Sequence, residues 1–138
     1  MSEQSDSELR VLIIDDQRSM RSIVRNLLGQ VGIDCVNEAE NGEEALAFLL
    51  EPLSDFPDVI ICDLHMGKMD GMEFCNAVRR NENLRNRQVP IIILTGDKDA
   101  FMHEVVEQVG ALKVLTKPVT ADELRDQIVS AVGFSSAS

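Results

Sequence analysis

The sequence lacks the features that mark several common protein classes. It contains no CxxC pair, no Cys/His cluster with the spacing of metal ligands and no apolar run long enough to cross a bilayer. Its three cysteines, Cys35, Cys62 and Cys75, lie far apart, and no secretory signal opens the chain. This cysteine usage is typical of a reducing compartment. We therefore expect a cytoplasmic protein with no membrane insertion, in which each cysteine is a small core residue.

Basic residues are also scarce. The chain has 13 Lys and Arg against 24 Asp and Glu, which gives a net charge of −11. A chain this acidic repels phosphate backbones, so we expect no nucleic acid as a direct partner. No Gly-rich phosphate loop follows the first apolar run, which disfavours a nucleotide-binding fold. The composition instead suits a protein that binds cations or docks on basic surfaces.

The chain has the size of a single domain. It contains 138 residues, 44% of them apolar, and it shows no internal repeat or low-complexity tract. The first nine residues are polar and acidic, and the last five form a short tail. We therefore expect a flexible N-terminal extension at 1–9, one domain at 10–133 and a short C-terminal tail at 134–138.

Strand and helix patterns alternate five times in this domain. Continuous apolar runs at 11–14, 59–62 and 91–94 are typical of strands covered on both faces, and 114–115 is a shorter run of the same kind. Segment 34–40 alternates and carries charge, so we assign it to a sheet edge. Amphipathic stripes with a helical period follow these five segments and include Leu27, Leu46, Cys75, Val106 and Ile128. The pattern predicts an α/β fold, a doubly wound five-stranded parallel sheet with helices on both faces.

Polar side chains follow the predicted strands where each strand ends. The first run continues into Asp15 and Asp16, the third strand into Asp63, the fourth into Thr95 and the last into Lys117. Right-handed crossovers place the carboxyl ends of parallel strands along one edge, where ligands bind in open sheets of this type. We therefore expect these five side chains to meet in one crevice.

Three clustered carboxylates predict a cation site at this edge. Their mutual repulsion makes it costly in free energy for all three to be ionised without a cation. Mg²⁺ prefers a few carboxylates together with waters and phosphate oxygens as its ligands. We predict Asp16 and Asp63 as direct ligands, with Asp15 acting through water as an option. A carboxylate beside the metal can attack phosphorus, and Lys117 and the Thr95 hydroxyl can bind the transferring phosphoryl group. Each residue alone also has an ordinary interpretation, as a helix cap, a solvated charge or a turn.

The whole pattern closely resembles the receiver domain of bacterial two-component response regulators. The resemblance covers nearly the whole chain. Its carrying segments are VLIIDD at 11–16, DVIICDLHMGKMDG at 58–71, PIIILTG at 90–96 and LTKP at 115–118. It implies a flavodoxin-like strand order of 2-1-3-4-5 and a stand-alone module similar to the chemotaxis regulators.

The resemblance also implies roles for the acidic residues. Asp63 is implied as the phosphoacceptor, Asp15 and Asp16 as the acidic Mg²⁺ pair, and the backbone carbonyl of His65 as a further ligand. The positions of His65 and Asp97 tune dephosphorylation in the family. The His65 side chain itself either positions water or is a solvated loop residue, and both interpretations stay open here.

Two positions depart from the commonest family pattern. Gly67 stands where proline is usual and predicts a looser loop after the acceptor. Val114 stands where many members have Tyr or Phe, an aromatic that swings inward with the threonine, so we do not transfer that aromatic gate to this chain. Thr95 resembles the hydroxyl that reorients toward the phosphoryl group, and Lys117 the residue that pairs with it. We expect both to shift the surface at 97–119.

The resemblance implies a signalling switch, not an enzyme with a substrate of its own. It implies a histidine kinase or histidine phosphotransfer protein as phosphodonor, small phosphodonors as substitutes, and an unidentified downstream protein target. Two sets of arginines are candidates for docking an acidic partner, and the alternative is an ordinary solvated face. They are Arg18, Arg21 and Arg25 in the first predicted helix, and Arg79, Arg80, Arg85 and Arg87 before the fourth strand.

Two other functions use the same residues. The first is a phosphatase or phosphotransferase that acts on small molecules through an aspartyl phosphate, but the chain lacks a cap domain and has no second acid two residues after Asp63. The second is a pseudo-receiver that keeps the fold only to bind proteins, which the complete set of polar residues disfavours. No output domain is evident, so we expect docking on another protein, as in chemotaxis, or onward transfer of the phosphoryl group.

Overall fold

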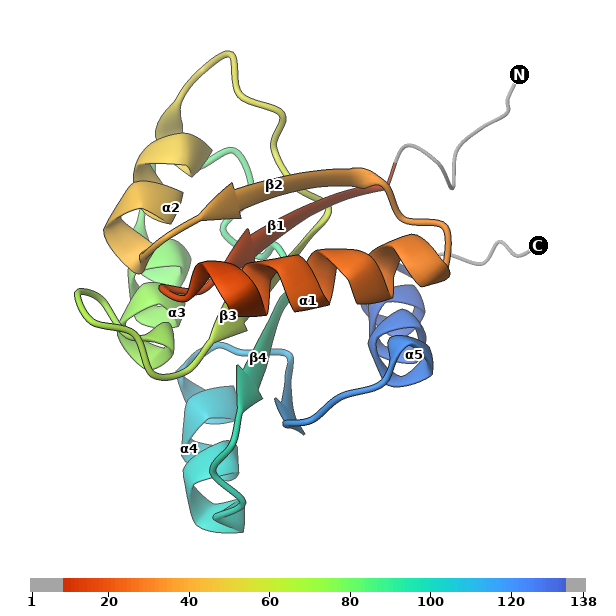
Figure 1. Ribbon diagram of the computed structural model, residues 1–138. Coiled ribbons are helices and arrows are strands. Elements are labelled where there is room, and N and C mark those ends of the chain that lie inside the picture. The colour runs from red at the N-terminus through yellow and green to blue at the C-terminus, as the bar shows by residue number, and fades with distance from the viewer. Residues whose placement is uncertain (1–8, 134–138) are drawn as a thin grey trace.

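The computed structural model describes residues 9–133 (Figure 1). Strands and helices alternate strictly within them. The strands are β1 (Arg10–Ile14), β2 (Cys35–Ala39), β3 (Val59–Asp63), β4 (Ile91–Thr95) and β5 (Lys113–Thr116), and the helices are α1 (Arg18–Gln30), α2 (Gly42–Leu50), α3 (Gly71–Arg80), α4 (Ala100–Val109) and α5 (Ala121–Val132). No helix within 9–133 is long and apolar enough to cross a membrane.

The predicted terminal segments fall almost entirely outside the described residues. Only Leu9 of the N-terminal extension lies within them, and none of the C-terminal tail does. Leu9 is 8% exposed and belongs to the core cluster that α1 and α5 cover. It is therefore part of the packed domain and not of a free extension.

The five strands form one parallel sheet in the order β2-β1-β3-β4-β5, as predicted. Strand β2, predicted at an edge, lies there and keeps most of its residues exposed or half-buried, whereas β3 and β4 are buried throughout. The pairing aligns Asp63 with Leu94 and Thr95 with Thr116. The carboxyl ends of β3, β4 and β5 therefore meet at one edge.

Side chains alternate along the strands into two cores, one on each face of the sheet. One core joins strand residues such as Ile61 to Leu28 of α1 and Leu124 of α5. The other joins residues such as Cys62 to Phe74 of α3 and to parts of α2 and α4. Helices α1 and α5 thus cover one face, and α2, α3 and α4 cover the other (Figure 1).

Local sequence signals set the helix ends. At the start of α3, the Asp70 side chain accepts from the Glu73 N–H at 2.8 Å, and the Glu73 side chain accepts from the Asp70 N–H at 3.0 Å. Thr120 and Glu123 form the same reciprocal pair at the start of α5. Gly110 ends α4 with a φ of 146°, which residues with side chains rarely adopt.

Candidate functional site

The five predicted polar residues all lie at the carboxyl edge of the sheet. Asp63 and Thr95 are the last residues of β3 and β4. Asp15 and Asp16 directly follow β1, and Lys117 directly follows β5. Because the strands are parallel and in register, their ends bring residues from four separate parts of the chain to one place.

The three aspartates form one compact acidic cluster. Asp15, Asp16 and Asp63 each offer a carboxylate oxygen, and these oxygens lie within 4.8 Å of one another. Asp15 and Asp63 are 4% and 8% exposed, whereas Asp16 is exposed. Burial raises the pKa of Asp15, and the neighbouring Asp63 charge adds to this, although a hydrogen bond from the Gln17 N–H at 2.9 Å opposes it. The cluster therefore holds more negative charge than the protein can neutralise easily.

Lys117 supplies a positive charge in direct contact with Asp63. Its Nζ lies 2.6 Å from Oδ1 of Asp63, and its side chain is 25% exposed. Its backbone N–H also donates to the Thr95 carbonyl at 2.7 Å, which anchors the loop after β5 to β4. The peptide bond between Lys117 and Pro118 is cis. One ammonium group thus lies at a cluster of three carboxylates and does not balance their charge.

Thr95 places its hydroxyl at the same edge but inside the fold. The residue is 1% exposed, and its Oγ1 accepts a hydrogen bond from the Asp97 N–H at 3.0 Å. The side chain of His65, two residues after Asp63, is exposed. Thr95 therefore belongs to the buried part of the edge, and the His65 side chain to its solvated rim.

The loop after Asp63 is attached to the acidic pair through Gly67. The Gly67 N–H donates to Oδ2 of Asp16 at 3.3 Å. A proline at this position has no N–H and could not make this bond. The glycine that departs from the commonest family pattern therefore adds a tether, whereas the sequence predicted only a looser loop.

A second glycine fits closely behind Asp63. A Cβ at Gly71, the first residue of α3, would lie 2.8 Å from the carbonyl oxygen of Asp63. The Gly71 N–H also donates to the Leu64 carbonyl at 2.8 Å. Any larger residue would push α3 away from the end of β3. One signal for this role is visible in the sequence: Gly71 ends the segment 58–71 that contains Asp63.

Arg21 was predicted to lie either on a basic docking face or on an ordinary solvated face, and its burial contradicts both interpretations. The residue is 7% exposed, and its Nη1 donates to the backbone carbonyl of Asp15 at 2.7 Å. Its Nε donates to Glu38 at 2.8 Å, and Arg25 donates to the other oxygen of the same carboxylate at 2.8 Å. Burial opposes ionisation of Glu38, but these hydrogen bonds outweigh it and lower its pKa. Only Arg18 in this set is exposed without such a bond among the described contacts.

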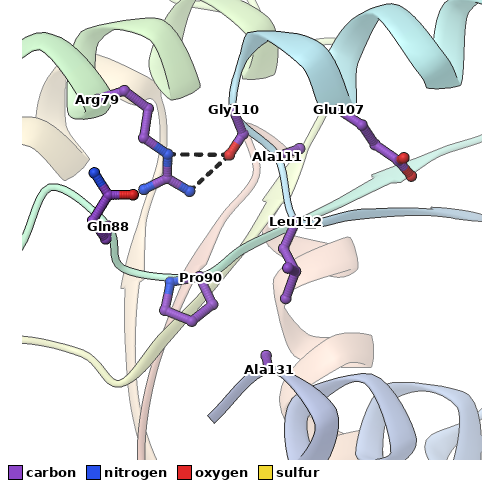
Figure 2. Close-up of a pocket in the computed structure, with 8 residues that line it drawn as sticks. All are labelled: Arg79, Gln88, Pro90, Glu107, Gly110, Ala111, Leu112 and Ala131. Atoms are coloured by element: carbon purple, nitrogen blue, oxygen red, sulfur yellow. Dashed lines mark hydrogen bonds between the residues drawn. The ribbon is translucent and has the colours of Figure 1, made fainter.

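The second set of arginines is also partly internal. The guanidinium of Arg79 donates twice to the Gly110 carbonyl, at 3.1 and 2.7 Å, and its Nη1 donates to the carbonyls of Arg87 and Val89. Figure 2 shows this group turned toward Gly110. Both residues line a hollow of about 560 Å³. The hollow lies next to Pro90, at the amino ends of β4 and β5. It is therefore at the opposite edge of the sheet from the acidic cluster.

The chain matches a known family over most of its length. Residues 11–129 match the family described as "Response regulator receiver domain". The chain is 33% identical to the probable chemotaxis protein CheY of Rhizobium etli over 126 residues, which cover 91% of this chain and 94% of that protein. It is 31% identical to the chemotaxis protein CheY-3 of Vibrio cholerae over 125 residues, which cover 89% and 91%.

Solved structures show the same architecture. The chemotaxis protein CheY4 of Vibrio cholerae superposes with a TM-score of 0.75 at 34% identity, covering 88% of this chain and 97% of that one. The receiver domain of the Francisella response regulator 1452 superposes with a TM-score of 0.78 at 27% identity, covering 90% and 96%. The strand order and the flavodoxin-like arrangement predicted from the sequence are confirmed. The chain belongs to the response regulator receiver domain family and is a CheY-like protein of two-component phosphorelay signalling.

Proposed function

We propose that this chain is a switch that accepts a phosphoryl group on Asp63 with the help of Mg²⁺. The observation that carries the proposal is the contact of 2.6 Å between Lys117 Nζ and Asp63 Oδ1 at the centre of the acidic cluster. An acceptor carboxylate needs an adjacent cation to hold the incoming phosphoryl oxygens, and Lys117 is already in place for this. The convergence of all five polar residues also disfavours a pseudo-receiver.

The donor set fits Mg²⁺. Three carboxylate oxygens within 4.8 Å of one another, one of them on the exposed side chain of Asp16, are hard oxygen ligands with excess negative charge. Asp15, Asp16 and Asp63 would hold the ion, with the His65 backbone carbonyl as a further ligand by family resemblance. When bound, Mg²⁺ would neutralise charge on the phosphoryl oxygens and on the acids.

The reaction is a transfer between a phosphohistidine and a carboxylate. A carboxylate oxygen of Asp63 attacks phosphorus, an O–P bond forms, and the N–P bond of the donor breaks with its electron pair returning to the imidazole. The ammonium group of Lys117 leaves the Asp63 carboxylate and pairs with the phosphoryl oxygens. The Thr95 hydroxyl donates a hydrogen bond to one phosphoryl oxygen, and its Oγ1 no longer accepts from the Asp97 N–H. The proposed switch is this change of partners by two side chains.

The proposed partners are a histidine kinase or histidine phosphotransfer protein and a downstream protein target. An apolar groove of about 350 Å³ lies beside the acceptor, between α1 and the loop after β5. Ile23, 51% exposed, and Leu27 line it from α1, and Lys117 lines it from the loop after β5. A donor protein that seats an apolar helix face there would bring its histidine next to Asp63. This groove suits docking better than the arginines of α1, since Arg21 is internal.

A small phosphodonor tests the proposal without the unknown kinase. The purified chain is incubated with acetyl phosphate, with and without Mg²⁺, and its intact mass is measured. We expect the mass of one phosphoryl group to be gained only with Mg²⁺. Asp63→Asn should gain none, and Lys117→Met should gain it at least about tenfold more slowly.

Lys113→Met is the matched control, because Lys113 is exposed and begins strand β5, at the opposite end of the strand from Lys117. It should behave as the wild type does. Equal phosphorylation of Asp63→Asn and wild type would refute the proposed acceptor. Turnover of an added phosphomonoester that Asp63→Asn abolishes would instead favour a small-molecule phosphatase.

A further inference from the structure

The hydroxyl of Thr95 is connected to α4 by two consecutive hydrogen bonds. The Asp97 N–H donates to Thr95 Oγ1 at 3.0 Å, and the Asp97 carbonyl lies 2.6 Å from Nε2 of His103. His103 is the fourth residue of α4 and is half-buried. The backbone of Asp97 therefore bridges the buried end of β4 and the first turn of this helix.

The direction of the His103 bond follows from its partner. A carbonyl oxygen can only accept, so Nε2 of His103 carries the proton and donates. The backbone N–H of His103 donates to the Asp99 carbonyl at 3.1 Å. Both the ring and the backbone of His103 are thus fixed relative to the β4–α4 loop.

Two further hydrogen bonds hold the β4–α4 loop between Thr95 and the first turn of α4. Asp97 Oδ1 accepts from the Asp99 N–H at 2.9 Å, and Asp99 Oδ1 accepts from the Phe101 N–H at 2.9 Å, which caps α4. A displacement of Asp97 therefore acts on both of these bonds. It is passed on to the first turn of α4, where Phe101 is 71% exposed.

The usual aromatic route to the surface is missing in this chain. Val114 is 7% exposed and belongs to the core cluster that includes Val106 of α4. A short β-branched side chain packed in this way has no inward and outward positions to exchange. A signal that starts at Thr95 therefore needs another physical connection to the surface.

We propose that His103 is a positioning residue that couples Thr95 to α4 through the backbone of Asp97. The coupling rests on the proposed function, since it starts when the Thr95 hydroxyl turns toward a phosphoryl group on Asp63. Oγ1 then stops accepting from the Asp97 N–H, and Asp97 moves. Because His103 holds the carbonyl of the same residue, the first turn of α4 follows and the exposed Phe101 changes its position.

Backbone amide and histidine-ring NMR of the full chain tests the coupling, with acetyl phosphate and Mg²⁺ as the phosphorylating mixture and intact mass as the separate measure of phosphorylation. In the wild type we expect the His103 Nε2 resonance and the amides of Asp97, Phe101 and Val105 to shift on phosphorylation. In His103→Leu, which has no ring donor, the mass gain and the Asp97 shift should persist. The Phe101 and Val105 shifts should fall to less than half.

Two further variants separate the hydrogen bond from a general effect on the helix. His103→Gln keeps an N–H donor at a similar reach and should restore most of the Phe101 shift. Glu104→Ala alters the next, exposed residue of α4 and should leave all shifts as in the wild type. This pattern of loss and rescue is what a merely structural role of His103 would not produce.

The possible failures are distinguishable. No mass gain in the wild type would overturn the proposed function and this coupling with it. A normal mass gain with undiminished Phe101 and Val105 shifts in His103→Leu would overturn the coupling alone. An unmoved His103 ring in the phosphorylated wild type would do the same, and this last measurement does not depend on the folding of any variant.

Discussion

Lys117 contacts two neighbouring strands at once: its Nζ lies 2.6 Å from Oδ1 of Asp63, and its backbone N–H donates to the carbonyl of Thr95 at 2.7 Å. The residue therefore joins the end of β3 to the end of β4 from the loop after β5. Its single positive charge faces the three carboxylates of Asp15, Asp16 and Asp63. This imbalance between one cation and three acids determines how the domain should respond to charge removal and to Mg²⁺.

Asp15→Asn should stabilise the domain when no divalent ion is present. Burial and the nearby Asp63 charge disfavour the ionised form of Asp15, and an Asn Oδ1 can still accept from the Gln17 N–H. We expect the free energy of unfolding to rise by roughly 1 kcal/mol in chelator. Urea denaturation measures it. With Mg²⁺ present the wild type should have the higher free energy of unfolding, because ion binding stabilises it more than the Asp15→Asn variant, which lacks one acidic ligand.

The same comparison has a defined pH dependence. The pKa of Asp15 is raised in the folded protein, so above that pKa the ionised Asp15 carboxylate lowers the stability of the fold. Below the ordinary value of 3.8, Asp15 is protonated in both the folded and the unfolded protein, and this loss of stability disappears. The advantage of Asp15→Asn in chelator should therefore be full at neutral pH and shrink as pH falls through the raised pKa. An advantage that grows on acidification would contradict the raised pKa.

Arg21→Met should destabilise the domain far more than Arg18→Met. The first change removes a donor from the buried carbonyl of Asp15 and one partner of Glu38, whereas Arg18 is exposed. We expect losses of roughly 2–4 kcal/mol for Arg21 and within about 0.5 kcal/mol for Arg18, measured by urea denaturation. Equal losses would mean that the contacts of Arg21 contribute nothing net.

Much of the fold was predictable because it follows from local patterns. Continuous apolar runs identified β1, β3 and β4, and the charge in segment 34–40 placed β2 at an edge. The candidate site was predictable for a related reason: residues that directly follow parallel strands must share one edge. The strand ends therefore brought Asp63 and Lys117 together without any knowledge of side-chain contacts.

The roles of the long side chains were not predictable in this way. Arg21, Val24 and Leu28 share the buried face of α1, so the helical period held a signal that Arg21 faces inward. Its partners, the Asp15 carbonyl and Glu38, are set only by how α1 packs on the sheet. The Nε2 contact of His103 with Asp97 likewise depends on tertiary placement. Interpretation of charged and polar residues from the sequence alone assigns side chains such as those of Arg21 and His103 to the surface.

Arg79→Met should destabilise the domain, and Arg80→Met should not. Arg79 donates to the carbonyls of Arg87, Val89 and Gly110, and so connects the end of α3 to two turns that precede β4 and β5. Its neighbour Arg80 is exposed. Loss of these bonds should lower the free energy of unfolding by roughly 2–3 kcal/mol. Thermal unfolding of the two variants side by side measures the difference, and similar midpoints would contradict the assignment.

The three cysteines should react with alkylating reagents at very different rates. Burial raises the pKa of the Cys75 thiol to about 12 and that of Cys62 well above its ordinary value. Cys35 is exposed on the edge strand β2, so the core position predicted for this cysteine was wrong. At neutral to mildly basic pH, Cys62 and Cys75 should react at least about a hundredfold more slowly than Cys35 in the native protein. Peptide mapping after timed alkylation measures this, with urea-unfolded protein as the control. Fast native modification of Cys62 would contradict the packing beside the acceptor.

Chemical trapping of the phosphorylated residue tests the central claim most directly. The chain is phosphorylated with acetyl phosphate and Mg²⁺ and treated with borohydride, which reduces an aspartyl phosphate to homoserine. The peptides are then mapped by mass. We predict homoserine at position 63 in the wild type and at no position in Asp63→Asn. Homoserine at 15 or 16, or a phosphoryl group retained on a histidine, would contradict Asp63 as the acceptor.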